Sequence, residues 1–153
     1  MKNESRYLFV RRGNTIISAK LSSIEISPKK DRALVGLPSG CALVDLYNGE
    51  IIHQLDLEVK DDPFLLEWSN QNLIAVGLGR RLLVIDDGGM KIWQLDFQSD
   101  IREMSWSNEG QYLAVITGEG NLCILTHDGE TVYERRWMTG SPYSIKWDPK
   151  DVG

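Results

Sequence analysis

Two histidines are the first candidates for chemistry in this chain, because imidazole is a common general base and metal ligand. They are His53 and His127, and neither stands with Ser, Cys or Asp in a recognisable catalytic order. The run Asp86–Gly89 lacks the spaced oxygen ligands of a calcium loop. GLGRR at residues 77–81 joins two predicted strands, so no helix N-terminus follows it to bind a phosphate. We therefore predict no catalytic, cofactor-binding or metal-binding residues.

The overall charge limits the class of partner. The chain has 17 basic and 22 acidic residues, a net charge of −5, which argues against nucleic acid or an anionic membrane as the main partner. The pairs Arg11-Arg12, Arg80-Arg81 and Arg135-Arg136 fall on different parts of the sequence pattern and are not expected to form one patch. No segment approaches 18 uncharged apolar residues, so we expect no direct membrane insertion. Proteins are therefore the class of partner that we expect.

The elements that position these residues belong to a repeat of about forty residues. An apolar first strand ends at Ile26, Trp68, Trp106 and Trp147, at intervals of 42, 38 and 41 residues. Four short strands within such a period are typical of β-propeller blades. The fixed phase of Trp68, Trp106 and Trp147 indicates packing between blades rather than a stacking platform for bases or sugars.

The other strands of each repeat have their own patterns. The second strands are apolar on both faces, as strands covered on both sides must be. The third strands run into dipeptides that favour tight hairpins, namely Asn48-Gly49, Asp87-Gly88 and Asp128-Gly129. We predict an all-β fold over residues 1–153, a single partial β-propeller. Its parts are a partial blade at 7–21, complete blades at 22–57, 63–98 and 100–138, and the first strand of a further blade at 142–148.

The residues that close these strands resemble the WD-repeat β-propeller family, in a divergent form. Val44-Asp45 and Ile85-Asp86 stand where the family has its Trp-Asp dipeptide, Leu125-Thr126 replaces that pair in the third blade, and the family's Gly-His dipeptide is missing. First strands are closed in the family manner by Ser27-Pro28, Trp68-Ser69, Trp106-Ser107 and Trp147-Asp148. The resemblance implies structural roles for Asp45 and Asp86 and a scaffold without catalytic residues.

Two phrases extend the resemblance. SWSNEGQYLAVITGEGNLCILTHDGE and SPYSIKWDPK are similar in style to propellers of intraflagellar-transport and coatomer-like trafficking scaffolds. This implies a place in a larger intracellular transport or ciliary complex. The two cysteines, Cys41 and Cys123, lie in different predicted blades and are not expected to form a disulfide, which favours a reducing compartment. We therefore expect a cytoplasmic protein, associated with a cilium or with trafficking.

Exposed connections supply the candidate partner-binding residues. In a propeller, the connection from a fourth strand to the next first strand shares a rim with the turn between second and third strands. That rim would carry Asp61, Asp62, Arg80, Arg81, Asp100 and Glu119. A mixed, acid-leaning loop surface on a rigid scaffold suits protein partners, although a rim that is merely solvated fits the same pattern.

These observations predict a non-enzymatic protein–protein interaction scaffold. Fifteen predicted strands leave a ring open, so a self-assembling partial propeller that closes as a homo-oligomer is an alternative, and so is completion by the rest of a longer propeller. A propeller enzyme is a third interpretation. Its central channel would offer as regular polar positions only Glu25, Glu67, Ser105 and Lys146.

Overall fold

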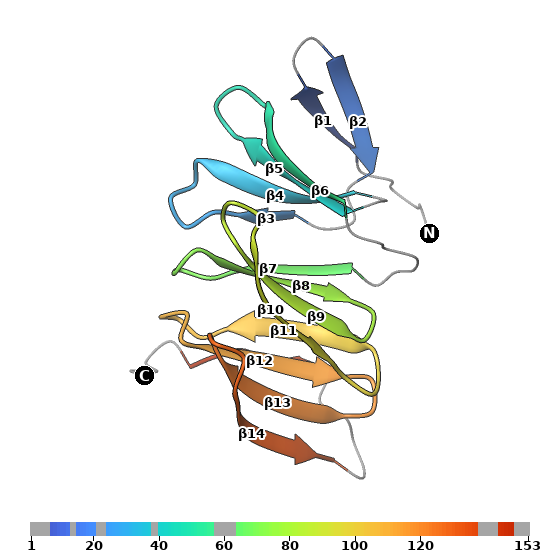
Figure 1. Ribbon diagram of the computed structural model, residues 1–153, viewed down its shortest axis with the longest axis vertical. Helices are drawn as coiled ribbons and strands as arrows, with labels where there is room; N and C mark the ends of the chain where they lie inside the picture. Colours follow the sequence, from blue (N-terminus) through green and yellow to red (C-terminus); the bar gives the residue numbers. More distant parts are fainter. Residues whose placement is uncertain are drawn as a thin grey trace. The chain divides into compact units, whose positions relative to one another are not determined.

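The computed structural model describes residues 7–12, 15–20, 24–37, 40–56, 64–137 and 144–148, which contain fourteen strands and no helix (Figure 1). Within these residues there is accordingly no helix long and apolar enough to cross a membrane. The strands are β1 (Tyr7–Arg12), β2 (Thr15–Lys20), β3 (Ile24–Ile26), β4 (Arg32–Leu37), β5 (Gly40–Asp45), β6 (Ile51–Asp56), β7 (Phe64–Trp68), β8 (Leu73–Leu78), β9 (Arg81–Asp86), β10 (Lys91–Asp96), β11 (Ile101–Trp106), β12 (Tyr112–Thr117), β13 (Asn121–Thr126) and β14 (Thr131–Arg136).

The chain divides into two compact units, unit 1 over residues 1–60 and unit 2 over residues 61–153. Unit 1 contains the β1–β2 hairpin and the sheet β3-β4-β5-β6. Unit 2 contains the sheets β7-β8-β9-β10 and β11-β12-β13-β14. Each four-stranded sheet is an antiparallel meander, which is the architecture of a propeller blade. The predicted fold class, all-β and a partial β-propeller, is confirmed.

The middle strands of each sheet carry the core. Side chains on both faces of β8 and β12 are at most 1 % exposed, because each strand is covered on both sides. They are Ile74, Ala75, Val76, Leu113, Ala114, Val115 and Ile116. The outer strand β14 is exposed at all six positions. The apolar second strands and the polar fourth strands of the sequence pattern thus correspond to the inside and the outer edge of each sheet.

A serine closes the first hairpin of each sheet. Ser27, Ser69 and Ser107 follow the last residue of the first strand and are buried. Each serine Oγ accepts a hydrogen bond from the backbone N–H that begins the second strand, at 3.1, 3.1 and 3.0 Å for Arg32, Leu73 and Tyr112 respectively. A buried hydroxyl is favourable only when it is paired, and this bond explains why serine recurs there.

The third strands end on a side chain that holds the next hairpin. Asp86 Oδ1 accepts hydrogen bonds from the backbone N–H groups of Gly88 and Met90, both at 2.9 Å. Asp45 Oδ1 does the same for Tyr47 at 2.8 Å and for Asn48 at 3.3 Å. In the third sheet Thr126 Oγ1 accepts from Glu130 N–H at 3.1 Å. A hydroxyl therefore replaces the carboxylate where the sequence departs from an apolar-Asp pair.

Tryptophans connect the sheets of unit 2. Trp68 and Trp106 are each only 8 % exposed. Trp106 Nε1 donates to the carbonyl oxygen of Glu67 at 3.1 Å, and Trp147 Nε1 donates to that of Ser105 at 2.8 Å. Both acceptors immediately precede the tryptophan of the preceding repeat, so one contact recurs with the period of the sequence.

Residues 144–148 differ from the sequence prediction, which made 142–148 a first strand. The described part of this segment has no strand assignment, because no neighbouring strand forms a ladder with it. Side chains hold it instead: Trp147 stacks on Tyr112 with ring centroids 6.4 Å apart, and Asn108 Nδ2 donates to the carbonyl oxygen of Asp148 at 2.8 Å.

The first strand of unit 1 also departs from the pattern. In the repeat, Ile24 and Ile26 occupy the apolar positions of a first strand, which are expected to be buried, yet they are 46 % and 54 % exposed. The residues at the same phase in unit 2, Leu66 and Met104, are 3 % and 2 % exposed. In unit 1 the hairpin that precedes this sheet packs through β1 against the outer strand β6. The apolar face of β3 consequently remains accessible within the described part of unit 1.

Candidate functional site

Three connections of unit 2 form the candidate site, which we call the unit 2 rim. They are the β8–β9 turn at 79–80, the β10–β11 connection at 97–100 and the β12–β13 turn at 118–120. Backbone hydrogen bonds join them. Phe97 N–H donates to Arg80 O at 2.8 Å, and Gly118 N–H donates to Asp100 O at 2.7 Å. The rim is therefore held by main-chain bonds that do not depend on the exposed side chains it carries.

Glycines in two of the turns allow the three connections to lie close together. Gly79 has φ +58 and Gly120 has φ +79, in the left-handed region that other residues adopt only at a cost. These values allow the two tight turns that end β8 and β12. Ser99 lies between them and its Oγ accepts a hydrogen bond from Glu119 N–H at 3.1 Å. The connection thus bridges two neighbouring sheets of unit 2.

The charged side chains of the rim are exposed and partly paired. Arg81 Nε lies 3.0 Å from Asp96 Oδ1, and Arg136 lies 3.8 Å from Glu119 Oε2. All four side chains are at least 43 % exposed, so the two ion pairs contribute little to stability. Their charges are thus available to meet a partner.

The structure brings four of the six predicted partner-binding residues to this rim. Arg80, Arg81, Asp100 and Glu119 lie at the ends of strands or in the turns of unit 2. Asp61 and Asp62 lie outside the described residues. The acid-leaning character expected of the rim depends on those two positions, because the four described residues carry two positive and two negative charges.

Two members of the rim, Asp96 and Arg136, are absent from the predicted partner-binding residues, although the sequence places Asp96 with Asp100 among the acidic residues of the second connection. Each ends a fourth strand, β10 or β14, and each pairs with a predicted residue. The repeat pattern could have identified both residues, because the last residue of a fourth strand lies at the same rim as the turn between the second and third strands. In the sequence, Arg136 stands out only as part of the basic pair Arg135-Arg136.

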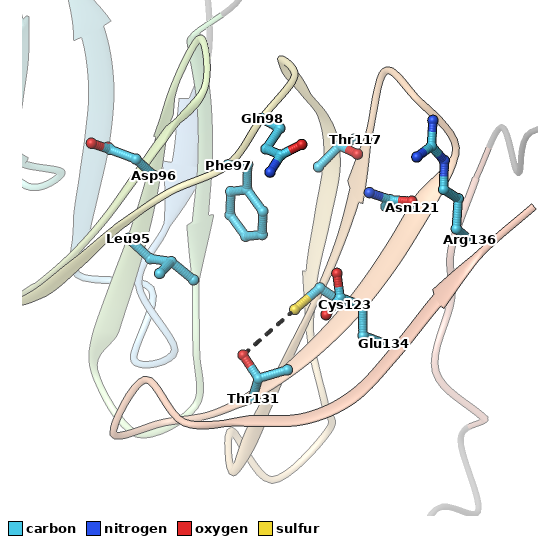
Figure 2. Close-up of a pocket in the computed structure, with 10 residues that line it drawn as sticks. All are labelled: Leu95, Asp96, Phe97, Gln98, Thr117, Asn121, Cys123, Thr131, Glu134 and Arg136. Atoms are coloured by element: carbon cyan, nitrogen blue, oxygen red, sulfur yellow. Dashed lines mark hydrogen bonds between the residues drawn. The ribbon is translucent and has the colours of Figure 1, made fainter.

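A cavity of about 540 Å³ opens beside the rim, between β10 with its following connection and the outer half of the β11–β14 sheet (Figure 2). The Phe97 ring points between the two walls, whereas the Asp96 side chain points away from the other lining residues (Figure 2). The lining residues are Leu95, Asp96, Phe97, Gln98, Thr117, Asn121, Cys123, Thr131, Glu134 and Arg136.

The one thiol of this cavity is not poised for nucleophilic chemistry. Burial raises the pKa of Cys123, and the nearby Glu134 carboxylate raises it further against the opposing effect of a 4.0 Å contact with Thr131 Oγ1. A thiol with a raised pKa is largely protonated near neutral pH. Cys41 is buried too, and its burial raises the pKa to about 12. Both cysteines are free thiols.

Metal-ligating clusters are absent from the residues that the structure describes. No group of three His, Cys, Asp or Glu side chains there could hold a metal ion. His127 Nδ1 lies 3.3 Å from Asp128 Oδ1, at an exposed hairpin turn far along β13 from the rim. The arrangement offers recognition chemistry, namely exposed charges on a rigid frame next to a partly apolar cavity.

Comparison with known proteins agrees with this reading of the fold. Residues 66–150 match the family described as "Anaphase-promoting complex subunit 4 WD40 domain". The chain is 34 % identical over 85 residues to the WD repeat-containing protein slp1 of Schizosaccharomyces pombe, a match that covers 52 % of this chain and 17 % of that protein. It is 30 % identical over 99 residues to the anaphase-promoting complex subunit cdc20 of Dictyostelium discoideum, covering 60 % of this chain and 20 % of that protein.

These matches span about a fifth of the length of either relative. The family match covers more than half of this chain and includes both four-stranded sheets of unit 2 almost entirely. With its repeat, its strand-closing serines and its four-stranded meanders, the chain belongs to the WD-repeat family, in the group of the anaphase-promoting complex subunit 4 WD40 domain.

Proposed function

We propose that this chain is a non-enzymatic scaffold module that binds other protein subunits through the unit 2 rim. WD40 propellers in general are non-enzymatic interaction proteins, which supports this role. The observation that carries the proposal is the rim itself, where three connections joined by backbone hydrogen bonds present exposed charges of both signs. A partner then meets a surface that needs little ordering on binding.

The charges of the rim suit recognition better than stability. Exposed ion pairs contribute on the order of 0–1 kcal/mol to folding, yet exposed charges set association rates and reject wrong partners. Arg80 lies in the β8–β9 turn and Asp100 ends the β10–β11 connection, and both residues are exposed. We include Asp61 and Asp62 in the proposed surface on the sequence pattern alone.

The names of the matched proteins favour one kind of assembly. One relative and the matching family are named for subunits of the anaphase-promoting complex. We therefore propose a multisubunit assembly as the setting in which this chain works. An intraflagellar-transport or vesicle-coat complex, with a cytoplasmic, ciliary or trafficking location, is the alternative setting. Its support is the style of two phrases, SWSNEGQYLAVITGEGNLCILTHDGE and SPYSIKWDPK.

Self-association is a second candidate function, favoured by one observation. Ile24 and Ile26 are about half exposed on a strand face that the repeat pattern makes apolar. Exposed apolar patches promote association. Light scattering on dilute samples of the 153-residue chain separates the two functions: a stable dimer or larger species supports self-association, and a monomer removes it.

Affinity capture with charge-reversed rim variants tests the main proposal. Arg80→Glu and Asp100→Lys should each reduce recovery of the partner proteins at least fivefold, while the urea midpoint of the purified chain stays unchanged. Lys91→Glu and Glu130→Lys are matched controls, because both residues are exposed and lie at the opposite ends of the strands. If the rim variants retain the full set of partners, the proposal fails.

A further inference from the structure

The cavity beside the unit 2 rim contains polar groups that the fold does not satisfy. Thr117 Oγ1 and Asn121 Oδ1 are shielded from solvent and have no hydrogen-bond partner. Thr117 is only 2 % exposed, and Asn121 is half-buried. Buried polar atoms in folded proteins are nearly always paired, so two such atoms in one cavity are a departure that needs a reason.

The strand register places these two groups on one face with the rest of the wall. Cys123 is opposite Val115 on β12 and opposite Glu134 on β14, and Asn121 is opposite Arg136. Because side chains alternate along a strand, these side chains share the face of the sheet that lines the cavity. Figure 2 shows Thr117, Asn121, Cys123 and Glu134 along this wall, facing Phe97 and Leu95 on the other.

One charged side chain of this wall has no ion-pair partner among the described residues. The guanidinium group of Arg136 is paired with Glu119, and that of Arg81 with Asp96. The Glu134 carboxylate has no ion-pair partner in the part of the chain that the structure describes, although it lies close enough to Cys123 to raise the pKa of that thiol. The wall therefore presents the Glu134 carboxylate directly, and it can present the Asn121 amide oxygen and the Thr117 hydroxyl oxygen when these side chains rotate. All three groups can accept hydrogen bonds.

The facing wall carries two apolar side chains that suit a long ligand side chain. Leu95 and Phe97 are partly buried and pack against the core of unit 2. An aromatic ring attracts a cation over its face, and the methylene stem of Lys or Arg packs well along apolar surface. Acceptors on one wall and an aromatic ring on the other together match a ligand with an apolar stem and a cationic, donor-rich end.

We propose that this cavity binds a basic side chain, lysine or arginine, of a partner polypeptide. Its charged group donates to Glu134 and, once the two side chains rotate, to Asn121 Oδ1 and Thr117 Oγ1, while its stem lies against Phe97. The inference rests on the proposed function, since the basic side chain belongs to a protein partner. It gives the rim a specific pocket in addition to its charges.

Titration of the full chain with small probes tests the proposal. The probes are N-acetyl-arginine amide, N-acetyl-lysine amide and N-acetyl-citrulline amide, the last being a neutral analogue of arginine. Two-dimensional ¹H–¹⁵N NMR spectra should show saturable shifts at Asn121 and Glu134. One or both cationic probes should saturate the site at a concentration at least fivefold below that of citrulline. Equal saturation by citrulline, or no saturable shift, overturns the proposal.

Two variants sharpen this test. Glu134→Gln should weaken the cationic probe at least fivefold, whereas the control Glu130→Gln, on an exposed turn outside the cavity, should leave it unchanged. Thr117→Val keeps the shape of the side chain and removes an unpaired hydroxyl. It should raise the urea midpoint and at the same time weaken the probe at least threefold, a combination that a purely structural role of Thr117 does not produce.

The two proposals can fail separately. If Glu134→Gln leaves probe binding unchanged while Arg80→Glu abolishes partner capture, the rim binds proteins and the cavity is not a site for basic side chains. If the cationic probe binds as expected but neither Glu134→Gln nor Arg80→Glu alters partner capture, the cavity binds cations and the proposed function of the rim is wrong.

Discussion

Replacement of Gly129 by alanine should destabilise the chain far more than the same change at the equivalent hairpin position, Gly49. Both glycines have positive φ, +92 and +73. A Cβ at Gly49 would meet no atom within 4 Å, whereas a Cβ at Gly129 would lie 2.8 Å from Cδ2 of Trp93. The comparison isolates a contact between two neighbouring sheets of unit 2.

The expected magnitudes follow from these contacts. A left-handed conformation costs an alanine about 1–2 kcal/mol, and the stiffer unfolded chain returns about 0.4–1 kcal/mol, so Gly49→Ala should cost about 1 kcal/mol. At Gly129 the Trp93 ring must also move, which costs about 1–3 kcal/mol. The same ring donates from Nε1 to His127 O at 2.7 Å, and weakening that bond adds about 1 kcal/mol. Gly129→Ala should therefore cost about 3–4 kcal/mol.

Urea denaturation followed by far-ultraviolet circular dichroism measures both variants. A Trp93→Ala background supplies a control within unit 2: there Gly129→Ala should cost only about 1 kcal/mol, because the obstructing ring is gone. If Gly129→Ala and Gly49→Ala cost the same in the wild-type background, or if the Trp93→Ala background makes no difference, the packing described between the β7–β10 and β11–β14 sheets is wrong.

Three further predictions concern packing, thiol chemistry and the rim. Trp68→Ala and Trp106→Ala should each destabilise by about 3–5 kcal/mol, as buried aromatic residues do, and an unchanged denaturation midpoint would instead indicate a surface role. Cys41, whose pKa burial raises to about 12, should resist iodoacetamide at pH 8 in the native chain and react in urea, so rapid native labelling would contradict its burial. Charge reversal at Asp61 and Asp62 should slow partner association without lowering stability, and unaltered association rates at low ionic strength would remove both residues from the proposed surface.

The sequence predicted the all-β fold because its signals are local and repeated. A strand that ends in Trp-Ser, an apolar run and a Gly-containing turn each indicate one element, and the forty-residue period combines them. The Gly-containing dipeptides also predicted the hairpin turns, although in one hairpin the residue with positive φ is shifted by one position. In the second hairpin positive φ falls on Gly89 rather than on Gly88, because Asp86 Oδ1 bonds Gly88 N–H and Met90 N–H and sets where the chain reverses.

Features that depend on contacts between distant residues could not be predicted in this way. The cavity joins Phe97 of one connection to Glu134 of another sheet, and no pattern within either strand indicates that they face each other. The exposure of Ile24 and Ile26 depends on where the preceding hairpin packs, which alternation along β3 does not determine. The repeat pattern likewise predicts a strand at 142–148, although a strand also needs a neighbour with which to pair, and the described residues 144–148 have none.

Site-specific photo-crosslinking tests the central claim that this chain binds proteins through the unit 2 rim. A photoreactive residue at Gln98 lies on the rim beside the cavity, and one at Asp128 lies on the exposed β13–β14 turn at the other end of the sheet. In cells that express the full chain at its natural level, position 98 should yield defined crosslinked partners and position 128 should not. Crosslinks of equal yield at both positions, or only at position 128, would contradict the account.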